Sequence, residues 1–190
     1  RMRTVLLLDY SGSMRDSAEA AGSDLQSLYE LLGLQFIDDY FDYFANVERG
    51  FATMAIVEFH DRNASATTVQ GFTDDPLTLK TALQNINITD NGASALLPAV
   101  LTASQVLVDA DFPYIGFDNA DVRSIALFSD GRLTTPPGEI QDYVDVLVER
   151  RARVVSVGWG LEVNHEPMAR LAASTGGHYY LTKQDVDGNP

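Results

Sequence analysis

Short apolar runs alternate with longer amphipathic segments along almost the whole chain. The clearest run, Thr4–Tyr10 (TVLLLDY), is nearly continuous in apolar residues, as expected of a strand buried on both faces. Strands separated by helices predict a doubly wound α/β fold, with a mainly parallel sheet and helices on both faces. We expect strands at Thr4–Tyr10, Ala52–Phe59, Thr67–Phe72, Arg123–Ser129, Val154–Val157 and His178–Thr182, and helices from Ser23 to near Asn46 and at Leu77–Ile86, Ala95–Val108, Glu139–Arg151 and His165–Thr175.

Several of these segments carry more detailed signals. Ser23 and Gln26 have the spacing of a capping box, which predicts that Ser23 caps the long helix. Thr67–Phe72 is short and close enough to the preceding strand to pair with it as a hairpin. The helical spacing in Glu139–Arg151 predicts that its inward residues are Ile140, Tyr143, Val144, Leu147 and Val148.

Length and charge limit the class of protein. A chain of 190 residues fits one domain, which we place at residues 1–184 and follow with an acidic tail at 185–190. Acidic residues outnumber basic ones by 27 to 13, so too few cations remain to neutralise the phosphates of a nucleic acid. No apolar run approaches the ~20 residues that cross a bilayer, which argues against direct membrane insertion. The chain begins directly with a strand and no signal peptide, so we expect it to be part of a longer multidomain protein.

Oxygen-bearing side chains gather at the predicted carboxyl ends of the strands, where ligands bind in open parallel sheets. Asp9, Ser11 and Ser13 follow the first strand, and alternation along this segment predicts that all three point to one side, with Gly12 allowing a tight turn. Ser94 opens a buried helix, and Asp130 ends the Arg123–Ser129 strand. Oxygen ligands without His or Cys favour Mg²⁺ or Ca²⁺, with Mn²⁺ also suitable, and the absence of cysteine excludes thiolate zinc sites.

These motifs resemble a known family. The stretch LLLDYSGSM resembles the opening strand and D-x-S-x-S motif of von Willebrand factor type A (VWA) domains, which have a Rossmann-like fold, and FSDG resembles their later strand-end Asp-Gly. The resemblance implies a metal-ion-dependent adhesion site in which Asp9, Ser11 and Ser13 match the first motif and Asp130 matches a later one. Ser94 stands where the family usually has threonine, and its hydroxyl keeps the ligand atom.

The resemblance also implies a mode of action. The ion would bind a protein or peptide partner whose Asp or Glu side chain completes the metal shell, without catalysis. The acidic, cysteine-free chain is similar to VWA modules of bacterial repeat-containing surface adhesins, which implies an extracellular or cell-surface location. A cytoplasmic VWA scaffold that works with an ATPase is the alternative. Asp185, Asp187 and Asn189 resemble part of a calcium loop, although an acidic tail explains them equally well.

Two further interpretations compete with the metal site. Each of the five site residues, taken singly, has an ordinary role as a turn or cap residue, and Ser94 in particular is a candidate N-cap of its helix. A serine hydrolase would use Ser94, Asp130 and then His165 or His178, which follow the chain order of an α/β-hydrolase triad. Against that interpretation, Leu96 occupies the position of the last glycine in the nucleophile motif.

Overall fold

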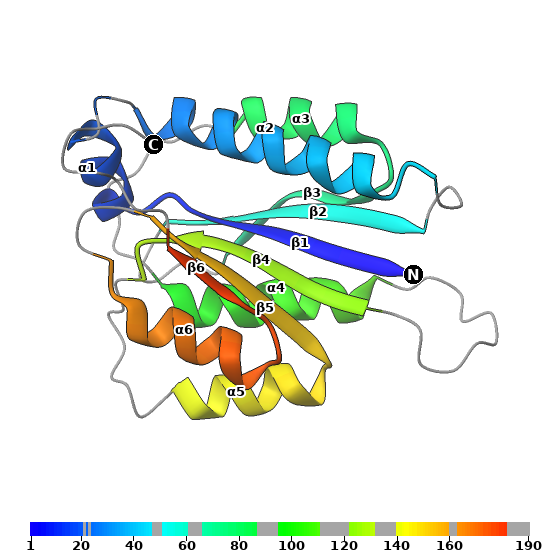
Figure 1. Ribbon diagram of the computed structural model, residues 1–190, viewed down its shortest axis with the longest axis vertical. Helices are drawn as coiled ribbons and strands as arrows, with labels where there is room; N and C mark the ends of the chain where they lie inside the picture. Colours follow the sequence, from blue (N-terminus) through cyan, green and yellow to red (C-terminus); the bar gives the residue numbers. More distant parts are fainter. Residues whose placement is uncertain are drawn as a thin grey trace.

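The structure is a computed structural model that describes residues 1–20, 22, 24–46, 51–60, 66–86, 95–110, 122–131, 140–159 and 163–181. These residues form the predicted doubly wound α/β fold, with a mainly parallel sheet and helices on both faces (Figure 1). The strands are β1 Met2–Asp9, β2 Ala52–Phe59, β3 Thr67–Thr73, β4 Val122–Ser129, β5 Ala152–Gly158 and β6 Tyr179–Leu181. The helices are α1 Gly12–Ala20, α2 Leu25–Tyr43, α3 Pro76–Gln84, α4 Leu96–Asp109, α5 Ile140–Glu149 and α6 His165–Ser174.

The strand order within the described sheet is β3-β2-β1-β4-β5-β6. Every neighbouring pair is parallel except β2 and β3, which form the expected antiparallel hairpin. The chain builds outward from β1 in one direction as far as β3 and then crosses back to β4 on the other side. The carboxyl ends of β1 and β4 therefore lie side by side, at the point where the strand order reverses.

Alternation along β1 divides the core into two layers. Val5 and Leu7 are fully buried in the layer beneath α4, α5 and α6. Leu6 and Leu8 face the opposite way and pack into the layer formed with α1, α2 and α3. Figure 1 shows the same division, with α2 and α3 over one face of the sheet and α4 to α6 over the other. Asp9, the last residue of β1, is also completely buried.

Two local predictions on the helices were wrong. The N-cap of α2 is Asp24, whose carboxylate accepts a hydrogen bond from the backbone N–H of Ser27 at 2.8 Å, so Ser23 is not the cap. On α5, Ile140, Val144 and Leu147 are buried as predicted, and Tyr143 packs partly against them. Val148, by contrast, is 53% exposed. It follows Leu147 by one residue, which turns it about 100° away from the buried stripe.

The short helix α1 was not among the predicted helices. It lies beyond the carboxyl ends of the strands in Figure 1. Met14 and Ala18 anchor it to the α2 layer of the core, because both side chains are fully buried there. Among the described helices, none is both long enough and apolar enough to span a membrane.

Candidate metal centre

Asp9, Ser11 and Ser13 come together at the end of β1, as the sequence predicts. Asp9 is completely buried, and its Oδ1 accepts a hydrogen bond from the backbone N–H of Ser11 at 3.0 Å. The hydroxyl oxygens of Ser11 and Ser13 lie 3.2 Å apart. The three residues therefore form one compact group of oxygen atoms.

The predicted reason for this grouping was partly wrong. Gly12 is the first residue of α1, so Ser13 lies in a helical turn and not at the next alternating position of an extended segment. The φ of Gly12 is not positive, so this position does not require the left-handed conformation that favours glycine. The helical turn, in place of strand alternation, brings the Ser13 hydroxyl back towards that of Ser11.

Asp130 enters the same region from β4, the strand next to β1. Leu8 pairs with Phe128 across these strands, so Ser129 and Asp130 follow at the level of Asp9 and just beyond it. Asp130 is 1% exposed, and its charge acts on the carboxylate of Asp9. The two acidic residues of the predicted site are therefore neighbours inside the protein.

Gly131 determines how the chain leaves Asp130. Its φ is +69°, a conformation that favours glycine. A Cβ atom here would lie 2.3 Å from the carbonyl oxygen of Asn164 and 2.9 Å from the sulfur of Met168. The backbone N–H of Asn164 donates to the carbonyl of Asp130 at 2.8 Å, which ties this turn to the start of α6. The Asp-Gly pair is thus a turn that also holds a buried carboxylate in place.

Two residues that hold Asp9 were missed by the sequence analysis. The hydroxyl of Ser129 donates to Asp9 Oδ2 at 2.5 Å and accepts from the backbone N–H of Gly131 at 2.9 Å. The buried hydroxyl of Tyr29, on α2, donates to the carbonyl of Asp9 at 2.6 Å. Ser129 lies within the quoted FSDG motif, and the parallel pairing of the first and fourth strands would have placed it beside Asp9. The helical pattern that includes Tyr29 identifies an inward position but not what its hydroxyl bonds.

Burial and like charge both oppose ionisation of Asp9. Its pKa is raised from 3.8 to about 6, first by burial and then by the nearby charge of Asp130. Hydrogen bonds from Ser129 and Ser11 act in the opposite direction but only partly offset this. Asp9 and Asp130 are both buried, so water does not screen the repulsion between their carboxylates. A divalent cation bound between them would stabilise the ionised pair.

The chemistry of the donor set fits such a cation. Within the described ranges, no three His, Cys, Asp or Glu side chains gather closely enough to hold a metal ion. The predicted centre does not need a third such group, because it combines the carboxylates of Asp9 and Asp130 with the hydroxyls of Ser11 and Ser13. Hard oxygen donors of this kind suit Mg²⁺, Ca²⁺ or Mn²⁺.

Ser94, the fifth predicted ligand, lies outside the described residues, as does the tail at 185–190. The structure does show that the N-cap of α4 is Ala95, so the alternative role of Ser94 as that cap was wrong. Of the residues considered for a hydrolase triad, His165 places its Nδ1 atom 2.6 Å from the hydroxyl of Tyr179, in an exposed position.

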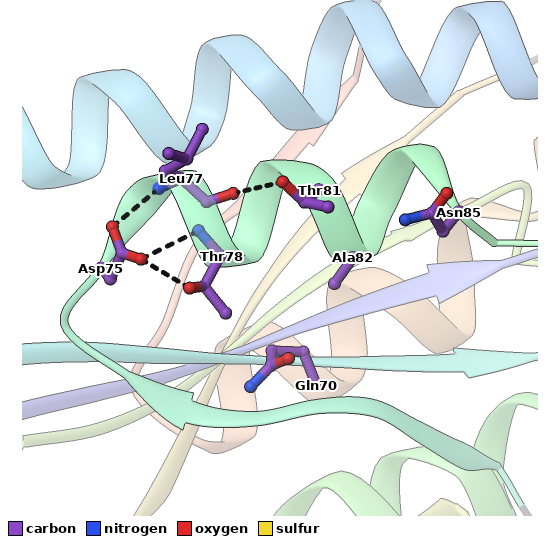
Figure 2. Close-up of a pocket in the computed structure, with 7 residues that line it drawn as sticks. All are labelled: Gln70, Asp75, Leu77, Thr78, Thr81, Ala82 and Asn85. Carbon is purple, nitrogen blue, oxygen red and sulfur yellow. Dashed lines mark hydrogen bonds between the residues drawn. The ribbon is translucent and has the colours of Figure 1, made fainter.

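A pocket of about 390 Å³ lies between α3 and β3 (Figure 2). Asp75, Thr78 and Thr81, on its α3 side, make hydrogen bonds within the helix and its cap. Asp75 caps α3 by accepting from the backbone N–H groups of Leu77 and Thr78 at 3.1 and 3.2 Å, and the hydroxyl of Thr81 donates to the carbonyl of Leu77 at 2.9 Å. Much of the polar lining therefore serves the helix itself, and none of the predicted ligands contributes to the pocket.

Comparison with known structures identifies the same architecture in other proteins. The conserved hypothetical protein BatB from Bacteroides thetaiotaomicron is similar over 98% of this chain and 93% of its own, with 15% identity and a TM-score of 0.71. A von Willebrand factor type A protein from Catenulispora acidiphila aligns with 96% of this chain and 39% of its own, at 16% identity and a TM-score of 0.70. Proximal thread matrix protein 1 from the mussel byssus, described with a zinc-occupied MIDAS motif, aligns over 96% and 42%, at 18% identity and a TM-score of 0.67. At these identities the likeness concerns the fold.

Sequence comparison supplies the family. No curated protein sequence matches the chain. The family model described as the von Willebrand factor type A domain matches residues 4–132, which include β1, the D-x-S-x-S segment and the Asp130–Gly131 turn. Since this match covers more than half of the sequence, the chain belongs to the von Willebrand factor type A domain family.

Proposed function

We propose that this domain binds one divalent cation through Asp9, Ser11, Ser13 and Asp130, with Ser94 as a fifth ligand, and uses the ion to bind a protein partner. Domains of this family generally mediate metal-dependent ligand binding. The observation that carries the proposal for this chain is the pair of buried carboxylates on adjacent strands. Burial and their mutual repulsion make ionised Asp9 costly, and a cation between the two would remove that cost.

The number of ligands leaves room for a partner. Mg²⁺ takes six oxygen ligands and Ca²⁺ takes six to eight. Five side chains that supply one oxygen each leave at least one position to a water molecule or to an oxygen of another molecule. A carboxylate suits that position because it adds negative charge to a hard cation. We therefore propose that the partner presents an Asp or Glu side chain and that the domain acts by binding and not by catalysis.

The preferred ions are Mg²⁺ and Ca²⁺, with Mn²⁺ also suitable, since all three favour oxygen ligands. The mussel protein whose MIDAS motif holds zinc is consistent with a divalent site in this fold. In our chain the donors are carboxylates and hydroxyls, without the histidine or cysteine that zinc favours. We therefore rank zinc below the other three ions.

A thermal-shift titration tests the metal site. A ligand that binds only the folded state raises the melting temperature. We expect Mg²⁺, Ca²⁺ or Mn²⁺ to raise it for the wild-type protein and not for Asp9→Ala. Asp145→Ala, at an exposed position on α5, is the matched control and should respond like the wild type. An equal response of Asp9→Ala and wild type would contradict the proposed site.

We propose an extracellular or bacterial cell-surface location and a role in adhesion, with a cytoplasmic scaffold partnered with an ATPase as the alternative. The acidic composition and the absence of cysteine are compatible with both. The parent gene separates them, because export signals and extracellular repeats would accompany an adhesin and a neighbouring ATPase gene would accompany a scaffold. For the hydrolase alternative, ester turnover that disappears in Ser94→Ala would overturn the non-enzymatic proposal.

A further inference from the structure

The start of α6 holds the turn that carries Asp130. The backbone N–H of Asn164, the N-cap of α6, donates to the carbonyl of Asp130 at 2.8 Å. Within the described structure, however, the Asn164 side chain makes no capping hydrogen bond. A capping side chain usually satisfies the first N–H groups of a helix and so secures its first turn. The position of this helix end, and with it that of the Asp130 turn, therefore depends on contacts with neighbouring elements.

The body of α6 is anchored to β5. Met168 is fully buried in the core, and its carbonyl accepts a hydrogen bond from the hydroxyl of Ser156 at 3.0 Å. At the other end of the helix, the backbone N–H of Val154 donates to the hydroxyl of Thr175 at 2.9 Å. These contacts involve Met168 or residues that follow it in α6. They therefore do not hold the first residue of the helix or its N-cap directly.

A tyrosine on β6 makes the contact that holds the helix start. The hydroxyl oxygen of Tyr179 lies 2.6 Å from Nδ1 of His165, the first residue of α6, which is hydrogen-bonding distance. The two rings also pack edge to face, with 5.9 Å between their centroids and 80° between their planes. The contact thus combines a hydrogen bond with ring packing, and it joins the last described strand to the beginning of α6.

Gly158, the last residue of β5, leaves room for this contact. A Cβ atom here would lie 2.5 Å from the hydroxyl oxygen of Tyr179 and 3.0 Å from Cγ1 of Val163. Tyr179 and Val163 both pack partly against the core layer beneath α4, α5 and α6. The tyrosine side chain therefore crosses the end of β5 to reach α6, and it can do so because Gly158 has no side chain.

We propose that Tyr179 is a positioning residue for the metal centre, acting through His165 and Asn164 on Asp130. The connection runs from the Tyr179 hydroxyl to His165, along one peptide bond to Asn164, and through its N–H to the carbonyl of Asp130. A ligand that is already held in place binds an ion more tightly, because less ordering accompanies binding. This inference rests on the proposed function, since Asp130 is one of the proposed ligands.

Hydrogen exchange of the metal-free protein, measured by NMR with a chelator present, tests the connection between Tyr179 and the Asp130 turn. Tyr179→Phe removes the hydroxyl and keeps the ring. The Asn164 amide should exchange about three- to tenfold faster in this variant, as expected for the loss of one local hydrogen bond. Tyr180→Phe, at the next and more exposed position of β6, is the matched control and should leave this rate unchanged. The Val154 amide, bonded at the far end of α6, should be unaffected in both variants.

Calorimetric titration with MgCl₂ tests the connection to the metal centre. Tyr179→Phe should weaken Mg²⁺ binding by about three- to tenfold, less than the ~10–100-fold typical of a group that bonds a metal ligand directly. His165→Ala should weaken it by a similar factor. The double variant should bind no more weakly than either single one, since both changes remove the same contact. His165→Asn should keep most of the wild-type affinity, because its amide offers a hydrogen-bonding atom near the place of Nδ1.

The outcomes separate this inference from the proposed function. Equal exchange of the Asn164 amide in wild type and Tyr179→Phe would overturn the positioning role. Faster exchange with unchanged Mg²⁺ affinity would also overturn it, because Tyr179 would then stabilise only the start of α6. Wild-type protein that binds none of Mg²⁺, Ca²⁺ and Mn²⁺ would refute the proposed function and the positioning role together, whereas the first two outcomes refute the positioning role alone.

Discussion

Replacing Asp9 with asparagine should stabilise the metal-free domain at neutral pH. The wild-type carboxyl has its pKa raised from 3.8 to about 6 in the folded protein. Each pKa unit corresponds to about 1.4 kcal/mol, so keeping Asp9 ionised in the folded state costs roughly 3 kcal/mol above pH 6. Asparagine has the same shape and no charge. It loses part of the bonding with Ser129 and Ser11, which we set at about 1 kcal/mol. The expected net gain is therefore about 2 kcal/mol.

The sign of the effect depends on pH. Because the folded pKa of Asp9 lies above its unfolded value, the folded state binds more protons between about pH 4 and 6, and its stability falls as pH rises through this window. Below pH 4 both states are protonated, so the cost of the charge is absent and only the weaker hydrogen bonding of the variant remains. Asp9→Asn should then be slightly less stable than the wild type. The difference between the two proteins should change sign at about pH 4.5.

Thermal denaturation in the presence of a chelator measures this difference. For a domain of this size, 2 kcal/mol corresponds to a melting temperature higher by roughly 4–8 °C for Asp9→Asn at pH 7.5. Asp145→Asn, at an exposed carboxylate on α5, should change little at any pH. Saturating Mg²⁺ should stabilise the wild type and not Asp9→Asn, reversing their order. A difference between wild type and Asp9→Asn that does not vary with pH would refute the electrostatic account of this site.

Three further variants test how the site is built. Ser129→Ala removes the donor to Asp9 Oδ2, so it should raise the pKa of Asp9 further and weaken Mg²⁺ binding without abolishing it, as calorimetry would show; unchanged affinity would contradict this role. Gly131→Ala and Gly176→Ala both place alanine at a positive φ, but only Gly131 lies against Asn164. In urea denaturation, Gly131→Ala should therefore lower the free energy of unfolding by about 1 kcal/mol or more beyond Gly176→Ala. Equal losses in the two variants would refute the close approach. Tyr29→Phe removes the hydroxyl that donates to the Asp9 carbonyl, so it should lower the free energy of unfolding by about 1 kcal/mol in the same assay. An unchanged free energy would show that this hydrogen bond does not stabilise the fold.

The local pattern of the sequence was sufficient to predict the main elements. Ala52–Phe59 has the predicted bounds because a continuous apolar run between turn residues is unambiguous when both faces are buried. Helix ends were harder, because Ser23 and Asp24 are adjacent and both residue types cap helices. The outward position of Val148 depends on where α5 meets its neighbours, which a helical period does not specify.

The sequence indicated the candidate ligands but not the residues that hold them. Asp9, Ser11 and Asp130 are residues with ligand chemistry at strand ends, so their types and positions both signal a site. The supports of Asp9 carry no such signal, because Ser129 is identified only by the register of β1 against β4 and Tyr29 only by the packing of α2. The coupling between Asp9 and Asp130 likewise depends on burial and proximity, which are properties of the folded chain.

Anomalous diffraction from crystals of the wild-type domain grown with Mn²⁺ tests the central claim most directly. The account predicts a manganese peak that contacts Asp9, Ser11, Ser13 and Asp130, directly or through one water molecule, and that is absent from Asp9→Ala crystals grown in the same way. The same map would show whether Ser94 is a ligand. A wild-type map with no manganese within reach of Asp9 and Asp130 would contradict the proposed metal centre.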